Sequence, residues 1–486
     1  MCYLGLDLGT SGLRGILIDQ DGNAIGSSEY HYTVNCPHSG WAEQDPANWV
    51  TALDHVISDL KTRFPRFADL RAIGVSGHMH GATLLDKGGN VLRPCILWND
   101  TRSDAQAKML DAMPEFRSIS GNIVFAGFTA PKLLWLKENE PHIYEQTKTV
   151  LLPAAYLNFV LTGTYVSDLS DSSGTSWLDV RNRKLASNLL EVCGLSADMM
   201  PELVEGCCAA GVLKSELAKR WGVNNNVVVA GGAGDNAAAA CGIGVLTDGQ
   251  GFVSLGTSGV VLAGRTDCEP SPETAVHTFC HAVPDRWYQM GVMLSATDSL
   301  NWLSRLVDKS PKDLTSALSQ DLKPPSSLRY FPYLSGERTP HNDPMVRAGF
   351  YGIDQRSDVR DMTQAVLEGV AFGLRDCAEA LMNTGAQFER LYVIGGGAAS
   401  DYWVKLLATV LNIPLERPVG GEFGAALGAA RLGMVAALGV APETVMRPPT
   451  SVEIFEPVAD LVVEFDRAYK QFKSDFSSHK NMSSRY

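Results

Sequence analysis

The chain has 486 residues, 45% of them apolar, and a formal net charge of −13 at pH 7. This length and apolar content predict a globular protein of two or three domains with a large buried core. The negative charge argues against a general nucleic-acid or anionic-membrane binder, because both functions need a basic face.

The first residues contain no basic segment, and an acid, Asp7, lies within the first apolar run. We therefore expect no signal peptide and predict a cytoplasmic protein. The ten cysteines include no C-x-x-C pair, which indicates reduced, packed thiols. A late Ala/Gly-rich stretch, 423–440, is interrupted by Arg431 and predicts a closely packed internal helix rather than a membrane span.

The N-terminal segment predicts a strand, a turn and a second strand. Apolar runs over 3–8 and 13–19 flank Gly9-Thr-Ser-Gly12, and a turn at 20–23 leads to a third strand over 24–34. The phosphate loops of P-loop and Rossmann proteins open a helix, whereas this Gly-Thr-Ser turn closes a hairpin. Its backbone N–H groups and hydroxyls could still hold a phosphate.

The following part predicts an amphipathic helix over 46–62 and strands over 71–75, 83–85 and 95–98. After the polar segment 99–102 it is mainly helical to about Gly222, with 168–174 as a loop. His78 and His80 follow the first of these strands. They could be half of a metal site, but zinc usually takes three or four protein ligands and no companion motif is present. A contact of one histidine with a polar substrate and a packed or capping histidine stay open as alternatives.

The middle of the chain predicts a strand over 227–229, a glycine turn and a helix that begins near Asn236. This order presents Asp235 at the carboxyl end of a strand, where open α/β sheets bind ligands. Capping of the following helix by Asp235 is the structural alternative.

A five-residue sequence, Leu-Gly-Thr-Ser-Gly, occurs at Leu8–Gly12 and again at Leu255–Gly259, each time between two apolar strands. The repeat indicates duplicated domains. We divide the chain into residues 1–246 and 247–486, and expect the polar tail from about Lys473 to be frayed. The copies differ in that Ser254 stands where the first copy has Asp7.

Glycine turns and single acids of this kind indicate a nucleotide phosphate chain held between two related domains. Phosphoryl transfer needs positioning, Mg²⁺ and a group that takes the proton of the acceptor hydroxyl. We expect Asp7 to face Mg²⁺ or its waters. Asp235, with ordinary acidity, is the expected base.

Phosphate contacts are expected from Thr10, Ser11 and Arg14 on one side and from Thr257 and Ser258 on the other. The alternatives are that the turn hydroxyls bond their own backbone and that Arg14 is a solvated strand residue. Further along, Glu337 and Arg338 either brace the cleft or pair on the surface, and the sequence leaves both open.

Other nucleotide-binding and hydrolytic classes fit less well. No P-loop motif occurs, and the serine-hydrolase elbow is nearly met at Gly74–Gly77 but fails at His78. Gly232–Ala237 matches a relaxed dinucleotide pattern, but Asp235 would put a negative charge where the pyrophosphate belongs.

Six segments together resemble the FGGY family of carbohydrate kinases: Asp7–Gly12, Gly40–Pro46, Gly231–Asn236, Leu255–Gly259, Tyr333–Arg338 and Gly395–Ala398. The resemblance runs from the first strand to about residue 435. It implies two actin-like (ribonuclease H-like) α/β domains around a central nucleotide cleft, with sugar bound by the N-terminal domain and ATP by the C-terminal one. The expected cofactors are ATP and Mg²⁺.

Within the family, four segments are most similar to the members that phosphorylate D-xylulose on its 5-hydroxyl: Gly77–Leu85, Arg93–Asp100, Gly127–Trp135 and Ser167–Gly174. That activity is therefore the expected one. By position, the resemblance implies Asp235 as catalytic base and Asp7 as an activity-critical acid. It also implies Met79, His80 and Asn236 in the sugar site.

On the nucleotide side, the resemblance implies Gly396, Gly397 and Asp401 near the adenine and Thr257 near the phosphates. This chain departs from the family pattern at His78, where the resemblance predicts Gln. If His78 points into the pocket, sugar preference or pH dependence changes; if it faces the core, nothing functional follows.

The alternative functions are a kinase for ribulose, glycerol or gluconate, an actin-like ATPase that acts as a chaperone or scaffold, and an NAD-dependent oxidoreductase. Partners are expected to be the sugar and ATP, with no nucleic acid or membrane, and a homodimer is compatible with the sequence.

Overall fold

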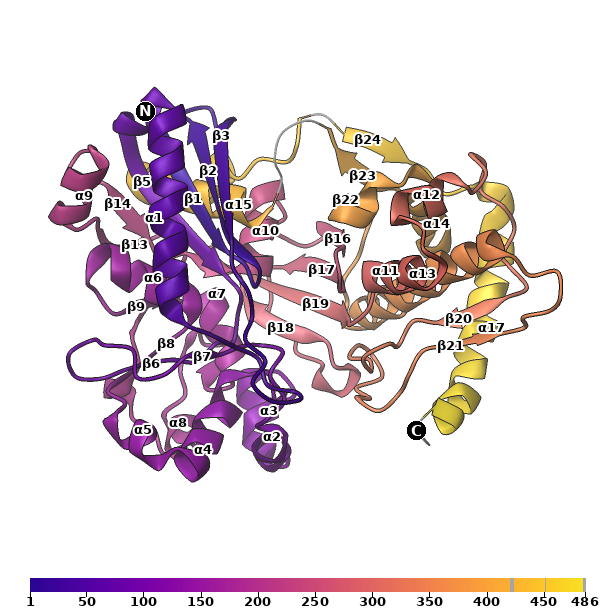
Figure 1. Cartoon of the computed structure of the whole chain (residues 1–486), viewed down its shortest axis with the longest axis horizontal. Helices are drawn as coiled ribbons and strands as arrows, with labels where there is room; N and C mark the ends of the chain where they lie inside the picture. The colour runs from indigo at the N-terminus through magenta and orange to yellow at the C-terminus, as the bar shows by residue number, and fades with distance from the viewer. Residues whose placement is uncertain (420–423, 451, 484–486) are drawn as a thin grey trace.

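The computed structural model describes residues 1–419, 424–450 and 452–483. It contains two seven-stranded sheets, one in each half of the chain, which lie beside one another with helices packed around them (Figure 1).

The first sheet has the order β13-β14-β5-β1-β2-β3, with β15 pairing the end of β5. Its central strand β1 is antiparallel to β2 and parallel to β5. The strands are β1 (Cys2–Leu8), β2 (Gly12–Asp19), β3 (Ala24–His31), β5 (Leu70–Gly77), β13 (Ala209–Val212), β14 (Val228–Ala230) and β15 (Ala233–Gly234).

The second sheet repeats this core. Its order is β18-β19-β17-β16-β22-β23-β24, and β16 is antiparallel to β17 and parallel to β22. The strands are β16 (Gly251–Leu255), β17 (Gly259–Arg265), β18 (His277–Cys280), β19 (Trp287–Met293), β22 (Leu391–Ile394), β23 (Leu415–Pro418) and β24 (Val452–Phe455). The predicted α/β class and the duplication are confirmed.

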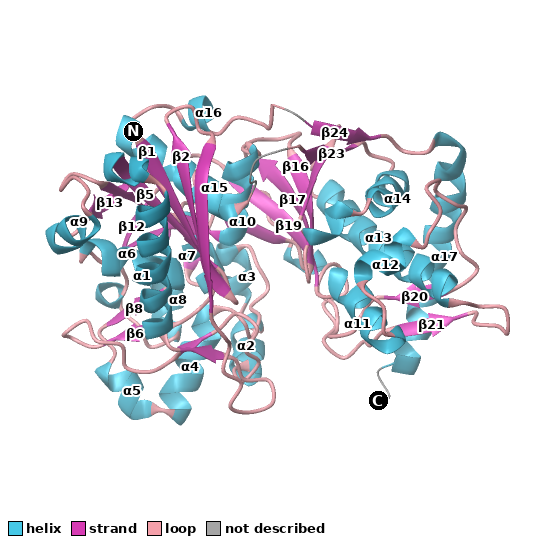
Figure 2. Ribbon diagram, turned by 45° about the horizontal axis from the view of Figure 1, so that its top comes forward, coloured by secondary structure: helices cyan, strands magenta, loops and turns pink. Residues whose placement is uncertain are grey.

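The first sheet lies between α1 (Pro46–Arg63) and α15 (Ala425–Leu438), as Figure 2 shows. α15 comes from the C-terminal half, and small residues let it lie directly on the strands. A Cβ atom at Gly5 would lie 1.8 Å from the carbonyl oxygen of Ala426, and one at Gly74 would lie 1.8 Å from that of Ala429. The Ala/Gly-rich stretch is thus an internal helix, and its positions 420–423 lie outside the described residues.

α10 (Asp235–Ile243), the helix that begins at Asp235, packs on α15, where a Cβ atom at Gly428 would lie 1.7 Å from the carbonyl oxygen of Ala238. Within the described residues, no helix is both long and apolar enough to cross a membrane.

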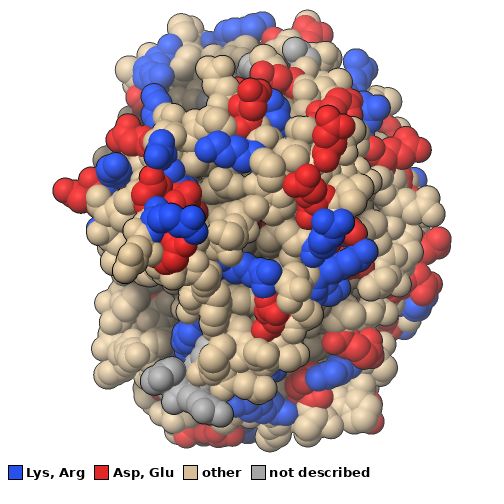
Figure 3. All heavy atoms as spheres, turned by 90° about the vertical axis from the view of Figure 1, so that its right-hand side faces the viewer, with Lys and Arg blue, Asp and Glu red and all other residues tan. Residues whose placement is uncertain are grey.

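The expectation of a frayed tail is wrong as far as Ser483, because α17 (Ala459–Ser483) continues through it, and positions 484–486 lie outside the described residues. Aromatic residues and a histidine recur every three or four residues on one face of this helix, and both Phe472 and His479 are buried. They stack on Phe331, with ring centroids 4.7 and 4.2 Å away. The outward side chains are polar and charged, and Figure 3 shows acidic and basic groups interspersed on the side of the molecule that carries α17.

Among the remaining elements, α13 is the longest and packs against β17 and β19 of the second sheet, with α14 beside it. The helices are α2 (Asp104–Asp111), α3 (Pro114–Ser120), α4 (Thr129–Asn139), α5 (Pro141–Gln146), α6 (Pro153–Thr162), α7 (Leu169–Ser172), α8 (Ser187–Val192), α9 (Ser215–Trp221), α11 (Thr297–Val307), α12 (Pro311–Ser316), α13 (Val359–Asn383), α14 (Asp401–Leu411) and α16 (Pro442–Val445). The strands are β4 (Glu43–Gln44), β6 (Thr83–Leu85), β7 (Cys95–Ile96), β8 (Thr149–Leu151), β9 (Val166–Asp168), β10 (Leu178–Asp179), β11 (Lys184–Leu185), β12 (Glu202–Val204), β20 (Arg329–Phe331) and β21 (Gly349–Tyr351).

Candidate active site

Two half-buried carboxylates, Asp7 and Asp235, lie at the carboxyl ends of strands in the first sheet. Asp7 is near the end of β1, which pairs in parallel with β5. Asp235 follows β15 directly, and β15 pairs in parallel with the last two residues of β5. The sheet therefore brings together two acids that are more than 200 residues apart in the sequence.

The turn before Asp235 depends on glycine. Gly232 has φ +93°, and a Cβ atom there would lie 2.3 Å from the carbonyl oxygen of Val75. Gly234 is the N-cap residue of α10 and Asp235 is the first residue of the helix. Asp235 is therefore not the N-cap residue itself, although its Oδ1 accepts the backbone N–H of the next helical residue, Asn236.

The pKa of Asp235 is raised to about 6 by desolvation and, secondly, by the negative charge of Asp7. Two hydrogen bonds to its Oδ1 oppose this rise in pKa: the backbone N–H of Asn236 donates at 2.7 Å and its Nδ2 at 2.9 Å. The expectation of ordinary acidity is wrong, because folding removes water from the carboxyl group and places a second acid beside it.

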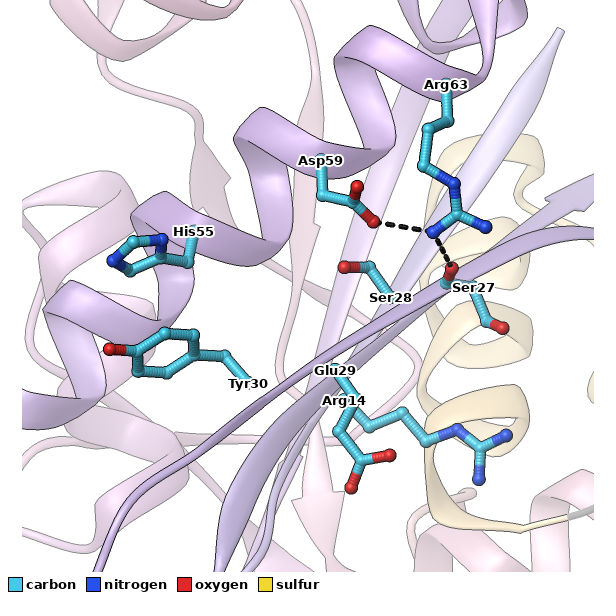
Figure 4. Close-up of a pocket in the computed structure, with 8 residues that line it drawn as sticks. All are labelled: Arg14, Ser27, Ser28, Glu29, Tyr30, His55, Asp59 and Arg63. Carbon is cyan, nitrogen blue, oxygen red and sulfur yellow. Dashed lines mark hydrogen bonds and ion pairs between the residues drawn. The ribbon is translucent and has the colours of Figure 1, made fainter.

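Desolvation also raises the pKa of Asp7, while a 2.9 Å hydrogen bond from Ser76 Oγ and the charge of Arg14 lower it. Arg14 is the cross-strand neighbour of both Asp7 and Glu29. Figure 4 shows Arg14 and Glu29 beside one another in a groove of about 460 Å³, which Asp59 and other residues of α1 line from the opposite side. Arg14 thus lies between two acids.

Met79 packs against the turn that carries Asp235. A Cβ atom at Gly234 would lie 2.8 Å from Met79 Cγ, and the hydroxyl of Tyr288 donates to Met79 Sδ at 3.8 Å. With Asn236 bound to Asp235, the structure therefore brings three of the predicted sugar-site and catalytic residues into one place.

His80 has a left-handed backbone, with φ +70°, which is uncommon for a residue other than glycine. Its carbonyl accepts hydrogen bonds from Lys132 Nζ at 2.8 Å and from Thr129 Oγ1 at 3.2 Å, and its ring stacks on Phe128 at 4.4 Å. Nδ1 lies 2.8 Å from the carbonyl oxygen of Gly174, so Nδ1 carries the proton and donates.

Burial lowers the pKa of His80 to about 3, and the charge of Lys132 adds to this effect. The ring is therefore neutral at pH 7, and its Nε2 is a hydrogen-bond acceptor.

His78 faces the core. It is 2% exposed, its ring meets Trp49 edge-on at 5.6 Å, and neither ring nitrogen has a hydrogen-bond partner within the described residues. Burial lowers its pKa to about 3. Because His78 does not share a surface with His80, and the described residues contain no group of three or more potential metal ligands, the metal-site alternative finds no support.

The turn residues predicted to contact phosphate lie at the ends of the two equivalent hairpins. Thr10 Oγ1 accepts a hydrogen bond of 3.0 Å from the indole N–H of Trp98, whereas Ser11 is exposed. Thr257 is also exposed, and its carbonyl accepts the backbone N–H of Ala296 at 2.9 Å.

Gly396, Gly397 and Asp401 line one cavity of about 1090 Å³ together with residues of α11 and α12. Asp401 is exposed and forms an ion pair of 2.7 Å with Arg417. The cavity has the size of a small-molecule site.

Sequence reasoning missed the segment 168–174, which was expected to be a loop. It begins with α7, capped by Asp168, whose side chain accepts the N–H groups of Ser170 and Asp171. Ser170 Oγ in turn accepts the N–H of Gly234 at 3.1 Å, and the same segment supplies the carbonyl that holds His80. An Asp followed by short polar residues was the available signal for a capped helix.

Arg338 also faces the site, which settles a question that the sequence left open. Its guanidinium lies 4.6 Å from the ring centroid of Phe125, and its positive charge helps to lower the pKa of His80. Glu337 is buried beside it. The two residues are not a surface ion pair.

Comparison with known families matches residues 2–242 to the N-terminal domain, and residues 251–437 to the C-terminal domain, of the FGGY family of carbohydrate kinases. The chain is 45% identical to the xylulose kinase of Escherichia coli (strain K12) over 90% of each chain, and 34% identical to that of Bacillus subtilis (strain 168) over 99% of this chain and 97% of the other. The crystal structure of a "xyloylose kinase" from Brucella ovis shares 51% identity, with a TM-score of 0.96 over 98% of this chain and 99% of that one. This protein belongs to the FGGY family of carbohydrate kinases.

Proposed function

We propose that this kinase transfers the γ-phosphoryl group of ATP to the 5-hydroxyl of D-xylulose and forms D-xylulose 5-phosphate. The observation that carries the proposal is the placement of Asp235, with a pKa of about 6, beside Met79 and Asn236. The activity named for the relatives in E. coli and Brucella ovis supports the choice of sugar.

In this mechanism Asp235 is the base. Asn236 holds its Oδ1 with two N–H donors, which leaves the second oxygen for the proton of the 5-hydroxyl. The hydroxyl oxygen then forms a bond to the γ-phosphorus while the bond from that phosphorus to ADP breaks. A base with a pKa near 6 is ionised at pH 7 and accepts a proton more readily than an ordinary carboxylate.

Asp7 fits a role toward Mg²⁺. Ser76 occupies its Oδ1, and within the described residues its Oδ2 accepts no hydrogen bond, which leaves an oxygen of the kind that Mg²⁺ or its waters prefer. When bound, Mg²⁺ would neutralise charge on the transferred phosphate. Asp7 would hold it through water.

We propose residues 1–246 as the sugar-binding domain and residues 247–486 as the ATP-binding domain. The turns with Thr10, Ser11 and Thr257 would hold the phosphates from both sides, with Arg14 adding positive charge to the first. The cavity with Gly396, Gly397 and Asp401 would take the adenosine. A homodimer also remains a prediction, for sedimentation measurements to test.

The test is an ADP-release assay with D-xylulose, D-ribulose, glycerol and gluconate as acceptors. We expect the highest kcat/KM with D-xylulose, and a higher value with another acceptor would replace the substrate assignment. Asp235→Ala should abolish turnover while ATP still binds, as measured by calorimetry. Near-normal activity of this variant would remove the base assignment.

A further inference from the structure

Arg338 belongs to the C-terminal half, yet its guanidinium reaches the aromatic wall on which His80 stacks. It lies over the Phe125 ring at 4.6 Å, and its Nη1 is 3.5 Å from Nε2 of His277. The rings of Phe125 and His277 both meet that of Phe128, at 5.5 and 5.7 Å, and Phe128 stacks on His80 at 4.4 Å. Arg338 and His80 are therefore two polar groups along one apolar wall.

The guanidinium has hydrogen-bond donors to spare. Among the residues that the structure describes, it forms no ion pair, and the contact with His277 is long for a hydrogen bond. Arginine carries five N–H donors and no acceptor. The half-buried side chain therefore keeps most of its donors for another molecule.

The neighbouring acid does not neutralise Arg338. The Oε1 atom of Glu337 accepts the backbone N–H groups of Leu294, at 3.0 Å, and of Arg338, at 2.8 Å. Burial raises the pKa of Glu337 to about 8, so this acid is mostly uncharged at pH 7. Among the described residues, Arg338 is left as a cation without an ion-pair partner.

The loop that carries Arg338 is held at several points. The backbone N–H of Thr339 donates to the carbonyl of Val292 at 3.0 Å, and its hydroxyl donates to the carbonyl of Ala275 at 2.8 Å. Further along, Asp343 pairs with Lys480 of α17 at 2.7 Å. A guanidinium fixed in this way can bind without a large loss of conformational entropy.

The chemistry of the sugar suggests what Arg338 would meet. With the 5-hydroxyl at Asp235, the other end of an open-chain ketose presents a C2 carbonyl, whose oxygen only accepts hydrogen bonds. We propose that Arg338 donates to the C1–C2 end of the ketose and so favours a ketose over the corresponding alditol. This assignment rests on the proposed function. The neutral His80 would complement it, because its Nε2 can accept from a sugar hydroxyl.

The experiment compares the KM of D-xylulose with the inhibition constant of xylitol, which carries a hydroxyl in place of the C2 carbonyl. A hydrogen bond to a charged group contributes about 1.5–3 kcal/mol. For Arg338→Met we therefore expect the KM of D-xylulose to rise about 10- to 100-fold, the inhibition constant of xylitol to rise by a smaller factor, and the KM of ATP to stay unchanged. Arg338→Lys should retain part of the preference, since it keeps the charge but loses the fork of donors.

Arg356→Met is the matched control, because Arg356 is exposed and its ion pair within the described part of the chain is with the nearby Asp354. If Arg338→Met raises both constants equally, or lowers kcat without raising the KM of D-xylulose, Arg338 only braces the aromatic wall and the inference is wrong. If this variant does not fold, thermal melts of Arg338→Lys replace it. A larger rise in Tm with D-xylulose than with xylitol then supports the inference, and equal rises contradict it. A wild-type enzyme without turnover of D-xylulose would overturn the proposed function itself.

Discussion

Ionisation of Asp235 lowers the free energy of unfolding, and the substitution Asp235→Asn tests this effect. Asn keeps the Oδ1 acceptor for both N–H groups of Asn236 but cannot ionise. The variant should therefore be more stable than the wild type and nearly inactive. Few substitutions of a structural acid would combine these two effects.

The magnitude follows from the pKa. The folded-state pKa of Asp235 is about 6 against an ordinary value of 3.8, and at about 1.36 kcal/mol for each pH unit the difference corresponds to about 3 kcal/mol. Because the carboxylate is only half-buried, solvent screens part of this, and we expect a gain of about 1–2 kcal/mol, or roughly 1–4 °C in Tm.

The sign depends on pH. Below the unfolded value of 3.8, Asp235 is protonated in both states, and the variant gains nothing. The wild-type penalty develops between pH 3.8 and about 6 and is fully present above that range. The gain in Tm should thus be full at pH 8 and shrink toward pH 4.

Thermal melts of both proteins across this pH range, with the ADP-release assay at pH 8, measure the two effects. We expect kcat to fall by a factor of about 10²–10⁴, the usual contribution of a general base. A variant that is no more stable than the wild type at pH 8, or whose kcat stays within tenfold, would refute the reasoning.

Three further substitutions test other parts of the site and fold. Asp7→Asn removes a negative charge that raises the pKa of Asp235. The fall of kcat/KM on the acidic side of its pH profile, near pH 6 in the wild type, should therefore move to lower pH. A pH profile that does not move would contradict the coupling of the two acids. His80→Ala should raise the KM of D-xylulose and leave that of ATP unchanged in the same assay, and an effect on ATP alone would show that the sugar site is misplaced. Phe472→Ala removes a buried ring of α17 and should lower the free energy of unfolding by about 3–5 kcal/mol in denaturant titrations; a loss below about 1 kcal/mol would mean that the end of this helix contributes little.

The local sequence pattern was enough to predict the features that arise within one short segment of the chain. The apolar runs and glycine turns predicted β1, β2 and the strand before Asp235, because strand and turn propensities depend on neighbouring residues. The repeated Leu-Gly-Thr-Ser-Gly likewise indicated two related sheets, and the resemblance to the family supplied the expected roles of the two acids. Those roles remain predictions.

Tertiary structure decided the properties that depend on contacts between distant residues. His78 and His80 are two positions apart, yet one packs on Trp49 in the core and the other stacks on Phe128. The tail looked frayed because its composition is polar, but its aromatic face has a partner in Phe331, more than 100 residues earlier.

The sequence by itself determined which side chains are available, namely two acids at strand ends and a basic residue in a loop. It also determined the local turns that present them. Only the folded sheets decided that Asp7 and Asp235 lie close enough to raise the pKa of the second, and that Arg338 reaches the wall beside His80. The physical reason is that desolvation and charge coupling depend on distances in space. Those distances are set by strand pairing and helix packing across the whole chain.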